Sequence, residues 1–99
     1  MHYFNIETKN GQHVGFLVML ADDETEAQPQ SGRFAVKVSD GVSGGMLTQF
    51  EQTDIPQYWR VVKDRVELFF DDTPVGTVRG EMLTISGQTF VLGDMVGAV

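Results

Sequence analysis

The stretch Val78-Arg79-Gly80-Glu81-Met82-Leu83-Thr84 decides the fold, because a nearly identical unit stands earlier in the chain. Val42-Ser43-Gly44-Gly45-Met46-Leu47-Thr48 carries Val, Gly, Met, Leu and Thr in the same register. The match resumes at Gln52-Thr53 and Gln88-Thr89. In each unit a glycine marks a turn, and the residues after it favour a short strand. A repeated unit of turn and strand predicts a meander of similar hairpins.

Strand and turn signals alternate along the rest of the chain. Residues 33–39 alternate between an apolar face, made by Phe34, Val36 and Val38, and a polar face. Asn10-Gly11 predicts a hairpin turn, because both residue types tolerate positive φ. The same reasoning predicts strands over residues 2–8, 14–21, 33–39, 46–53, 58–62, 65–70, 75–79, 82–86 and 89–92.

This spacing predicts an all-β fold in a single domain over residues 1–99. We expect a small antiparallel β-barrel or curved meander of about eight short strands, with a two-sheet β-sandwich as the alternative. Gly15, Gly76 and Gly80 lie in strand-like stretches and suit the sharp bends of a barrel. The repeated unit resembles the hairpins of lipocalin- and streptavidin-like barrels, a resemblance that assigns no role to any residue.

Composition narrows the classes of partner. The 99 residues carry a net charge of −7, which disfavours nucleic acid and anionic membranes as partners. The chain has no cysteine, which excludes disulfides and thiolate zinc sites. Its longest apolar run, Val14 to Ala21, is far shorter than a membrane span. The first residues do not resemble a secretory signal, so a cytoplasmic location is expected.

Motifs for catalysis or cofactor binding are not found in the sequence. It has no phosphate-binding glycine motif and no Gly-x-Ser-x-Gly elbow, so we expect no enzyme activity, no cofactor and no metal. A hairpin around Asn10-Gly11 is expected to bring His2 and His13 together on adjacent strands, at the end of the hairpin away from the turn. Surface histidines explain this pair more simply than a shared metal ion. The acidic run Asp22–Glu26 is expected to form a solvated loop.

An aromatic cluster is the first candidate for a binding surface. If Trp59, Val66, Leu68 and Phe70 point inward, then Tyr58, Arg60 and Phe69 point outward. These residue types are enriched at the centres of protein interfaces. Trp59 itself is more simply a core residue.

The apolar strand Gly15–Leu20 is the second candidate. A small barrel buries one face of a strand, so either Phe16, Val18 and Leu20 or the pair Leu17 and Met19 needs other cover. A homodimer contact supplies such cover, and so does a loop over residues 21–32 that folds back. We include Leu17 and Met19 with Tyr58, Trp59, Arg60 and Phe69 in the hypothetical binding surface.

The sequence therefore favours a non-enzymatic, small acidic protein-binding module of the inhibitor, immunity, adaptor or assembly type. We expect a homodimer, and a protein partner for which the net charge favours a basic surface. One alternative is a small-molecule carrier of lipocalin- or streptavidin-like architecture, which a cavity in the barrel would favour. A second alternative is a carboxylate-dependent enzyme, which would need two acids with strongly raised pKa values in a cleft.

Overall fold

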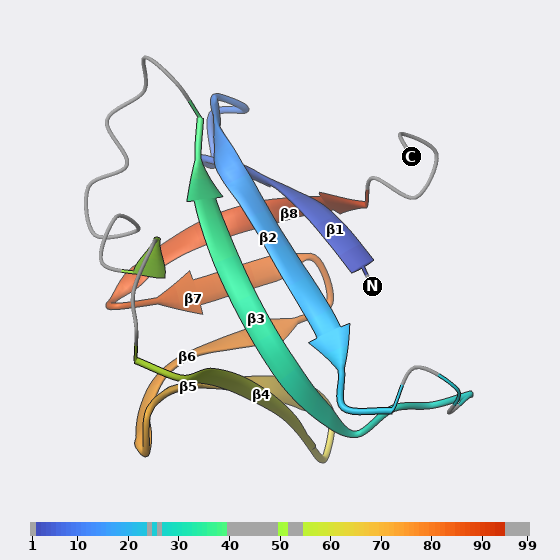
Figure 1. Ribbon diagram of the computed structural model, residues 1–99. Coiled ribbons are helices and arrows are strands. Elements are labelled where there is room, and N and C mark those ends of the chain that lie inside the picture. The colour runs from blue at the N-terminus through green and yellow to red at the C-terminus, as the bar shows by residue number, and fades with distance from the viewer. Residues whose placement is uncertain (1, 24, 26, 40–49, 52–54, 95–99) are drawn as a thin grey trace.

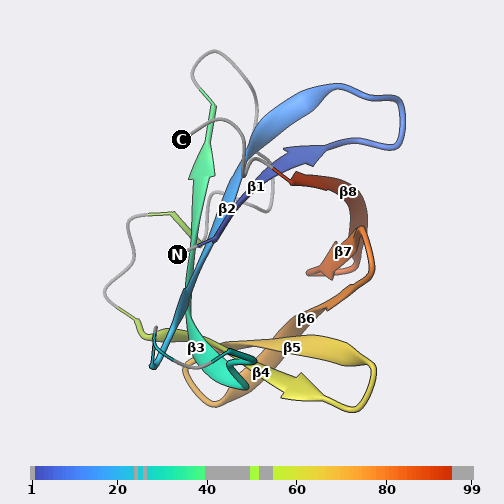
Figure 2. The same cartoon turned by 90° about the vertical axis from the view of Figure 1, so that its right-hand side faces the viewer.

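The protein is a closed, eight-stranded antiparallel β-barrel in which each strand pairs with its neighbour in sequence and β1 closes on β8 (Figure 1). The computed structural model describes residues 2–23, 25, 27–39, 50–51 and 55–94. The strands are β1 (His2–Glu7), β2 (His13–Ala21), β3 (Ser31–Val38), β4 (Gln57–Val62), β5 (Arg65–Phe70), β6 (Thr73–Arg79), β7 (Met82–Ile85) and β8 (Gln88–Asp94). The predicted barrel is confirmed, and Figure 2 looks along its axis.

Tight turns with positive φ produce the hairpins. Ser86 and Gly87 have φ values of 50° and 80° and join β7 to β8 by two residues, which is the conformation that matches the twist of paired strands. Gly80, at φ 59°, begins the turn between β6 and β7. The second copy of the repeated unit is therefore a turn and a strand, as predicted. The first copy, residues 42–48, lies outside the described residues.

The strand predicted over residues 46–53 falls mostly on residues that the structure does not describe. At the two that it describes, Phe50 and Glu51, the chain is not in a strand. β3 pairs directly with β4 instead, through Gly32 opposite Trp59. Phe50 is 1% exposed, and its ring lies 6.2 Å from that of Phe34 and 5.5 Å from that of Phe70. The hydrophobic side chain at residue 50 is therefore a core residue that comes from outside the strands.

The interior of the barrel is the hydrophobic core. On β3 the alternation in sequence decides the faces, since Phe34 and Val36 are buried and Arg33 is exposed. On β2 the inward residues are Leu17 and Met19, because Leu17 lies opposite Phe4 on β1 and Val36 on β3. The buried hydrophobic residues are Ile6, Val14, Leu17, Phe34, Val36, Phe50, Trp59, Leu68, Leu83, Ile85, Phe90 and Leu92.

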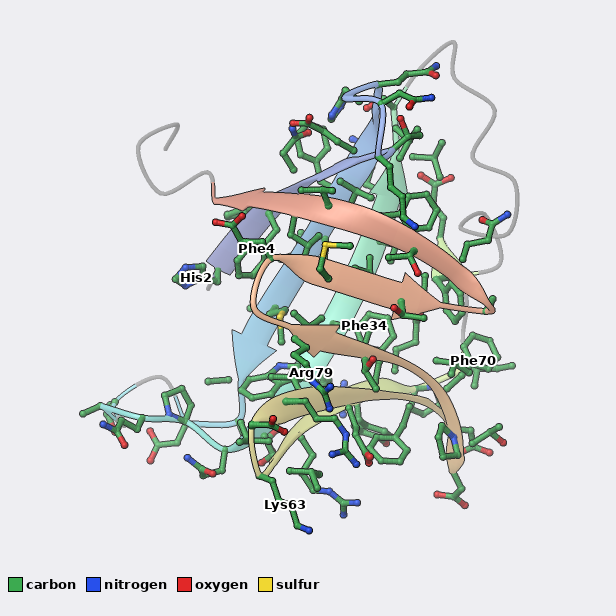
Figure 3. All side chains as sticks on the ribbon, turned by 180° about the vertical axis from the view of Figure 1, so that it is seen from behind. His2, Phe4, Phe34, Lys63, Phe70 and Arg79 are labelled. Carbon is green, nitrogen blue, oxygen red and sulfur yellow. The ribbon has the colours of Figure 1, made fainter. Side chains whose placement is uncertain are left out.

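The two ends of the barrel differ. At one end, which we call the plugged end, Phe50 packs on Phe34 and Phe70. At the other, which we call the open end, the side chains of Phe4, Met19 and Val78 pack against the core but remain partly exposed. Figure 3 shows Phe4 and Phe70 toward opposite ends, with Phe34 between them.

Candidate functional site

The outer surface of β2 to β5 gathers the aromatic and arginine side chains. Leu20 lies opposite Arg33, Arg33 opposite Tyr58, and Tyr58 opposite Phe69, so four neighbouring strands contribute one continuous row. A second row beside it runs from Tyr3 through Val18 to Ala35. Residues in register on one face of a sheet are in contact range, so the two rows form one patch. We call this patch the contact face, and it comprises Tyr3, Phe16, Val18, Leu20, Arg33, Ala35, Tyr58, Arg60 and Phe69.

Arginine–aromatic contacts organise the contact face. The guanidinium of Arg33 lies 6.0 Å from the centre of the Tyr58 ring, and that of Arg60 lies 5.1 Å from the centre of the Phe69 ring. A cation above an aromatic face is attracted by the ring quadrupole. Tyr58 is nevertheless 37% exposed, whereas Phe69 is half-buried beneath Arg60. The predicted outward direction of Tyr58, Arg60 and Phe69 is confirmed.

A hollow of about 420 Å³ opens in the contact face. Apolar groups from Tyr58, Trp59 and Phe69 line it, together with Arg60. Carboxylates stand on its other sides, from Asp22 at the end of β2 and from the turn between β5 and β6. The lining residues are Asp22, Ser31, Gly32, Tyr58, Trp59, Arg60, Phe69, Asp71 and Asp72. The hollow therefore offers both charge signs beside exposed aromatic surface.

Trp59 is part of the core, yet its indole reaches the wall of this hollow. The indole Nε1–H donates a 3.0 Å hydrogen bond to the Leu20 carbonyl on β2, so the ring must cross β3. Gly32 makes the crossing possible. A Cβ at that position would lie 2.6 Å from Trp59 Nε1 and 1.8 Å from Leu20 O. This glycine allows a close approach that no other residue fits.

Two of the predicted binding residues lie elsewhere. Leu17 is completely buried inside the barrel, so its expected place on a binding surface is wrong. Met19 also points inward and lines the open end. The outward face of β2 is instead Phe16, Val18 and Leu20. The sequence does not distinguish Leu17 and Met19 from the outward set, because the residues on both faces of β2 are apolar.

The predicted pairing of His2 with His13 is wrong. His2 lies opposite Met19 and His13 lies opposite Glu7, so the two histidines are at the two ends of the β1–β2 hairpin. The reason is geometric, since His13 follows the turn by two residues and must sit at its closed end. Among the described residues, no group of three or more His, Asp or Glu side chains could hold a metal ion.

His13 instead joins a polar network on β1, β2 and β3 that the sequence did not reveal. Asn5 Nδ2 donates to Glu7 Oε2 at 2.5 Å, which leaves Asn5 Oδ1 to accept a hydrogen bond from His13 Nδ1. The other ring nitrogen, Nε2, forms a 2.5 Å hydrogen bond with the Ser39 hydroxyl. Because Asn5 Oδ1 can only accept, His13 Nδ1 carries a hydrogen in this arrangement.

A hydroxyl, an imidazole and an amide in this order can activate a nucleophile. Acyl transfer also needs N–H donors aimed at a developing oxyanion. The N–H of Ser39 donates to Val14 O at 3.1 Å, and the N–H of Val38 donates to Glu51 Oε2 at 2.8 Å. The network ties β1 and β2 to the residue that follows β3, and we call it the clasp.

The fold and this site define a small closed β-barrel with an aromatic and arginine-rich outer face. A family model described as HLGFF-containing, Neisseriales, matches residues 1–99, and the chain belongs to that family. No curated protein and no solved structure matches the chain. The five letters of the family's description agree with His13-Val14-Gly15-Phe16-Leu17 at His13, Gly15 and Phe16.

Those three residues begin β2 and have distinct structural roles. His13 is the centre of the clasp, and its ring meets that of Phe16 edge-on with 4.9 Å between the centroids. A Cβ on Gly15 would lie 2.3 Å from the Lys37 carbonyl oxygen, so a side chain there would clash with β3. Within the described part of the chain, no helix is long and apolar enough to cross a membrane.

Proposed function

We propose that this protein is a non-enzymatic, protein-binding module whose contact face binds a second copy of the chain. The observation that carries this proposal is the outward face of β2. Phe16, Val18 and Leu20 are only half-buried there, and they adjoin exposed Tyr58 and Tyr3. Removing apolar surface from water stabilises an association by about 25 cal/mol per Å². Tyrosine and arginine beside such a surface are the residue types that dominate binding energy in interfaces.

The charges on the contact face favour a self-complementary contact. Arg33 and Arg60 lie within the face, whereas Asp22, Asp71 and Asp72 stand at one edge of it. A twofold axis brings the same patch of each copy together, so the arginines of one copy can meet the aspartates of the other.

Solution mass by light scattering tests the proposal. We expect a dimer, and we expect Val18→Ser and Tyr58→Ser to give folded monomers, because both residues point outward from the barrel. The loss of one such anchor typically costs more than about 1.4 kcal/mol, which is a tenfold rise in Kd. Met82→Ser is the matched control, since Met82 is 39% exposed on β7, and this variant should remain a dimer.

Two results would contradict the proposal. One is a monomeric wild-type protein at every concentration tested. The other is a dimer that keeps its affinity in both contact-face variants. Circular dichroism and thermal unfolding on each variant would separate loss of the dimer from loss of the fold.

A further inference from the structure

The open end of the barrel holds a hollow that differs from the contact face. It has a volume of about 300 Å³, which is at the small end of the range for ligand sites. Its walls come from five strands and from the loop between β2 and β3. The lining residues are His2, Phe4, Met19, Ala21, Pro29, Trp59, Val61, Val66 and Val78.

Apart from the exposed His2 and the indole N–H of Trp59, the lining of this hollow is apolar. The indole Nε1–H of Trp59 already donates to the Leu20 carbonyl, so it does not offer a hydrogen bond to a ligand. Phe4, Met19, Val61, Val66 and Val78 contribute hydrocarbon or thioether surface. The hollow therefore favours an apolar group, because a polar group would lose its hydrogen bonds to water without gaining others.

The plugged end indicates what such a hollow accepts. There the barrel surrounds the side chain of Phe50, which comes from outside the strands and is 1% exposed. At the open end, none of the described side chains fills the corresponding space. A water molecule occupies about 30 Å³ of the liquid, so 300 Å³ has room for on the order of ten heavy atoms of a ligand.

We propose that the open end binds the aliphatic chain of a single-chain amphiphile of medium length. The chain lies against Met19, Val66 and Val78, and the polar head stays in solvent at the rim. Met19 is unbranched and flexible, so its thioether side chain can adapt to an aliphatic chain, and the valines add hydrocarbon wall. This site lies inside the barrel and the contact face lies outside, so neither proposal depends on the other.

Fluorescence of Trp59 provides a direct test, because it is the single tryptophan of the chain and it lines the hollow. The probe is decanol, titrated below the concentration at which it aggregates, with butanol as the short-chain comparison. We expect saturable change in the emission with decanol at one site per chain. Butanol should bind at least tenfold more weakly, since it buries far less apolar surface.

Substitutions decide whether the signal comes from this hollow. Val78→Phe fills it and should weaken decanol binding at least tenfold. Thr77→Phe is the matched control, because Thr77 directly precedes Val78 on β6 and points to the opposite face of the sheet. The Thr77→Phe variant should therefore bind decanol as tightly as the wild type does. Ala21→Leu is a second filling variant, which adds side-chain volume from β2 instead of β6. Thermal unfolding should show that every variant used is folded.

Saturation that is lost in the folded filling variants and kept in Thr77→Phe supports the proposal. Absence of saturation with the wild type overturns it. It is also overturned if a folded Val78→Phe or Ala21→Leu binds decanol as the wild type does. Retention of binding in Tyr58→Ser would show in addition that the signal does not arise at the outer hollow, which Trp59 also lines.

Discussion

The plugged end and the open end of this barrel are made by the same strands, yet they are completed in different ways. At the plugged end, Phe50 brings a third aromatic ring to Phe34 and Phe70, and the Phe50 carbonyl accepts a 3.1 Å hydrogen bond from Gln57 Nε2. At the open end, Phe4 and Met19 keep part of their surface exposed. The comparison shows that the side chains of eight short strands do not fill the barrel at either end. Phe50 fills the remaining space at the plugged end, and a hollow remains at the open end.

The largest expected effect is on the plug itself. Phe50→Ala should lower the free energy of unfolding by about 3–5 kcal/mol, because it removes a fully buried ring and leaves a cavity. Phe4→Ala at the open end should cost roughly half of that or less, since its ring is already partly exposed and water can enter the space. Urea unfolding of both variants measures the difference. Equal losses would mean that the two ends are equally well packed.

A smaller effect should come from added volume. Val36→Leu should destabilise the protein by about 1–3 kcal/mol, because Val36 is 4% exposed and a further methylene in a packed core must displace neighbouring side chains. Val78→Leu at the open end should change the free energy of unfolding by less than about 1 kcal/mol, since its extra carbon extends into the hollow. A thermal melt of each variant gives the comparison. A clear loss of stability in Val78→Leu would argue that the hollow is closed in solution.

The smallest effect concerns the loop that borders the open end. Hydrogen bonds from the Thr25 hydroxyl and the Thr25 N–H lower the pKa of the Asp23 carboxyl. A lowered pKa contributes stability above the ordinary titration range, and this contribution is lost as pH falls through the folded-state pKa. Thr25→Ala should raise the pKa of Asp23 in an NMR titration. Because Asp23 is fully exposed, the melting temperature at neutral pH should not change measurably.

The strands and their turns could be predicted from sequence where local rules decide them. The alternation of Phe34, Val36 and Val38 fixed the faces of β3, and the hairpin between β4 and β5 fixed the direction of Tyr58 and Arg60. β2 was different, because a strand that is apolar on both faces has no pattern that distinguishes inside from outside. Only pairing with Phe4 and Val36 places Leu17 in the core.

The features that sequence did not reveal depend on contacts between distant residues. Phe50 looked like part of a strand, since an apolar residue that plugs a barrel and one that faces its interior have the same chemistry. The His13 clasp requires the register that sets residues 5, 13 and 39 side by side. The close approach at Gly32 depends on the Trp59 indole, which reaches from β4 to β2. No local sequence pattern predicts this contact.

Closure between β1 and β8 has a consequence for how the chain reaches this fold. The other strand pairings of the barrel join neighbours in sequence, and most can form early as local hairpins, whereas Phe4 must find Asp94 from nearly the whole chain away. Loop-closure entropy makes such a step late and slow. Until it is complete, β1 and β8 are free edges, and β1 lies beside the apolar strand β2. Free edges recruit strands from other chains. Refolding at high protein concentration should therefore compete with domain-swapped assembly, whereas refolding in dilute solution should close the ring.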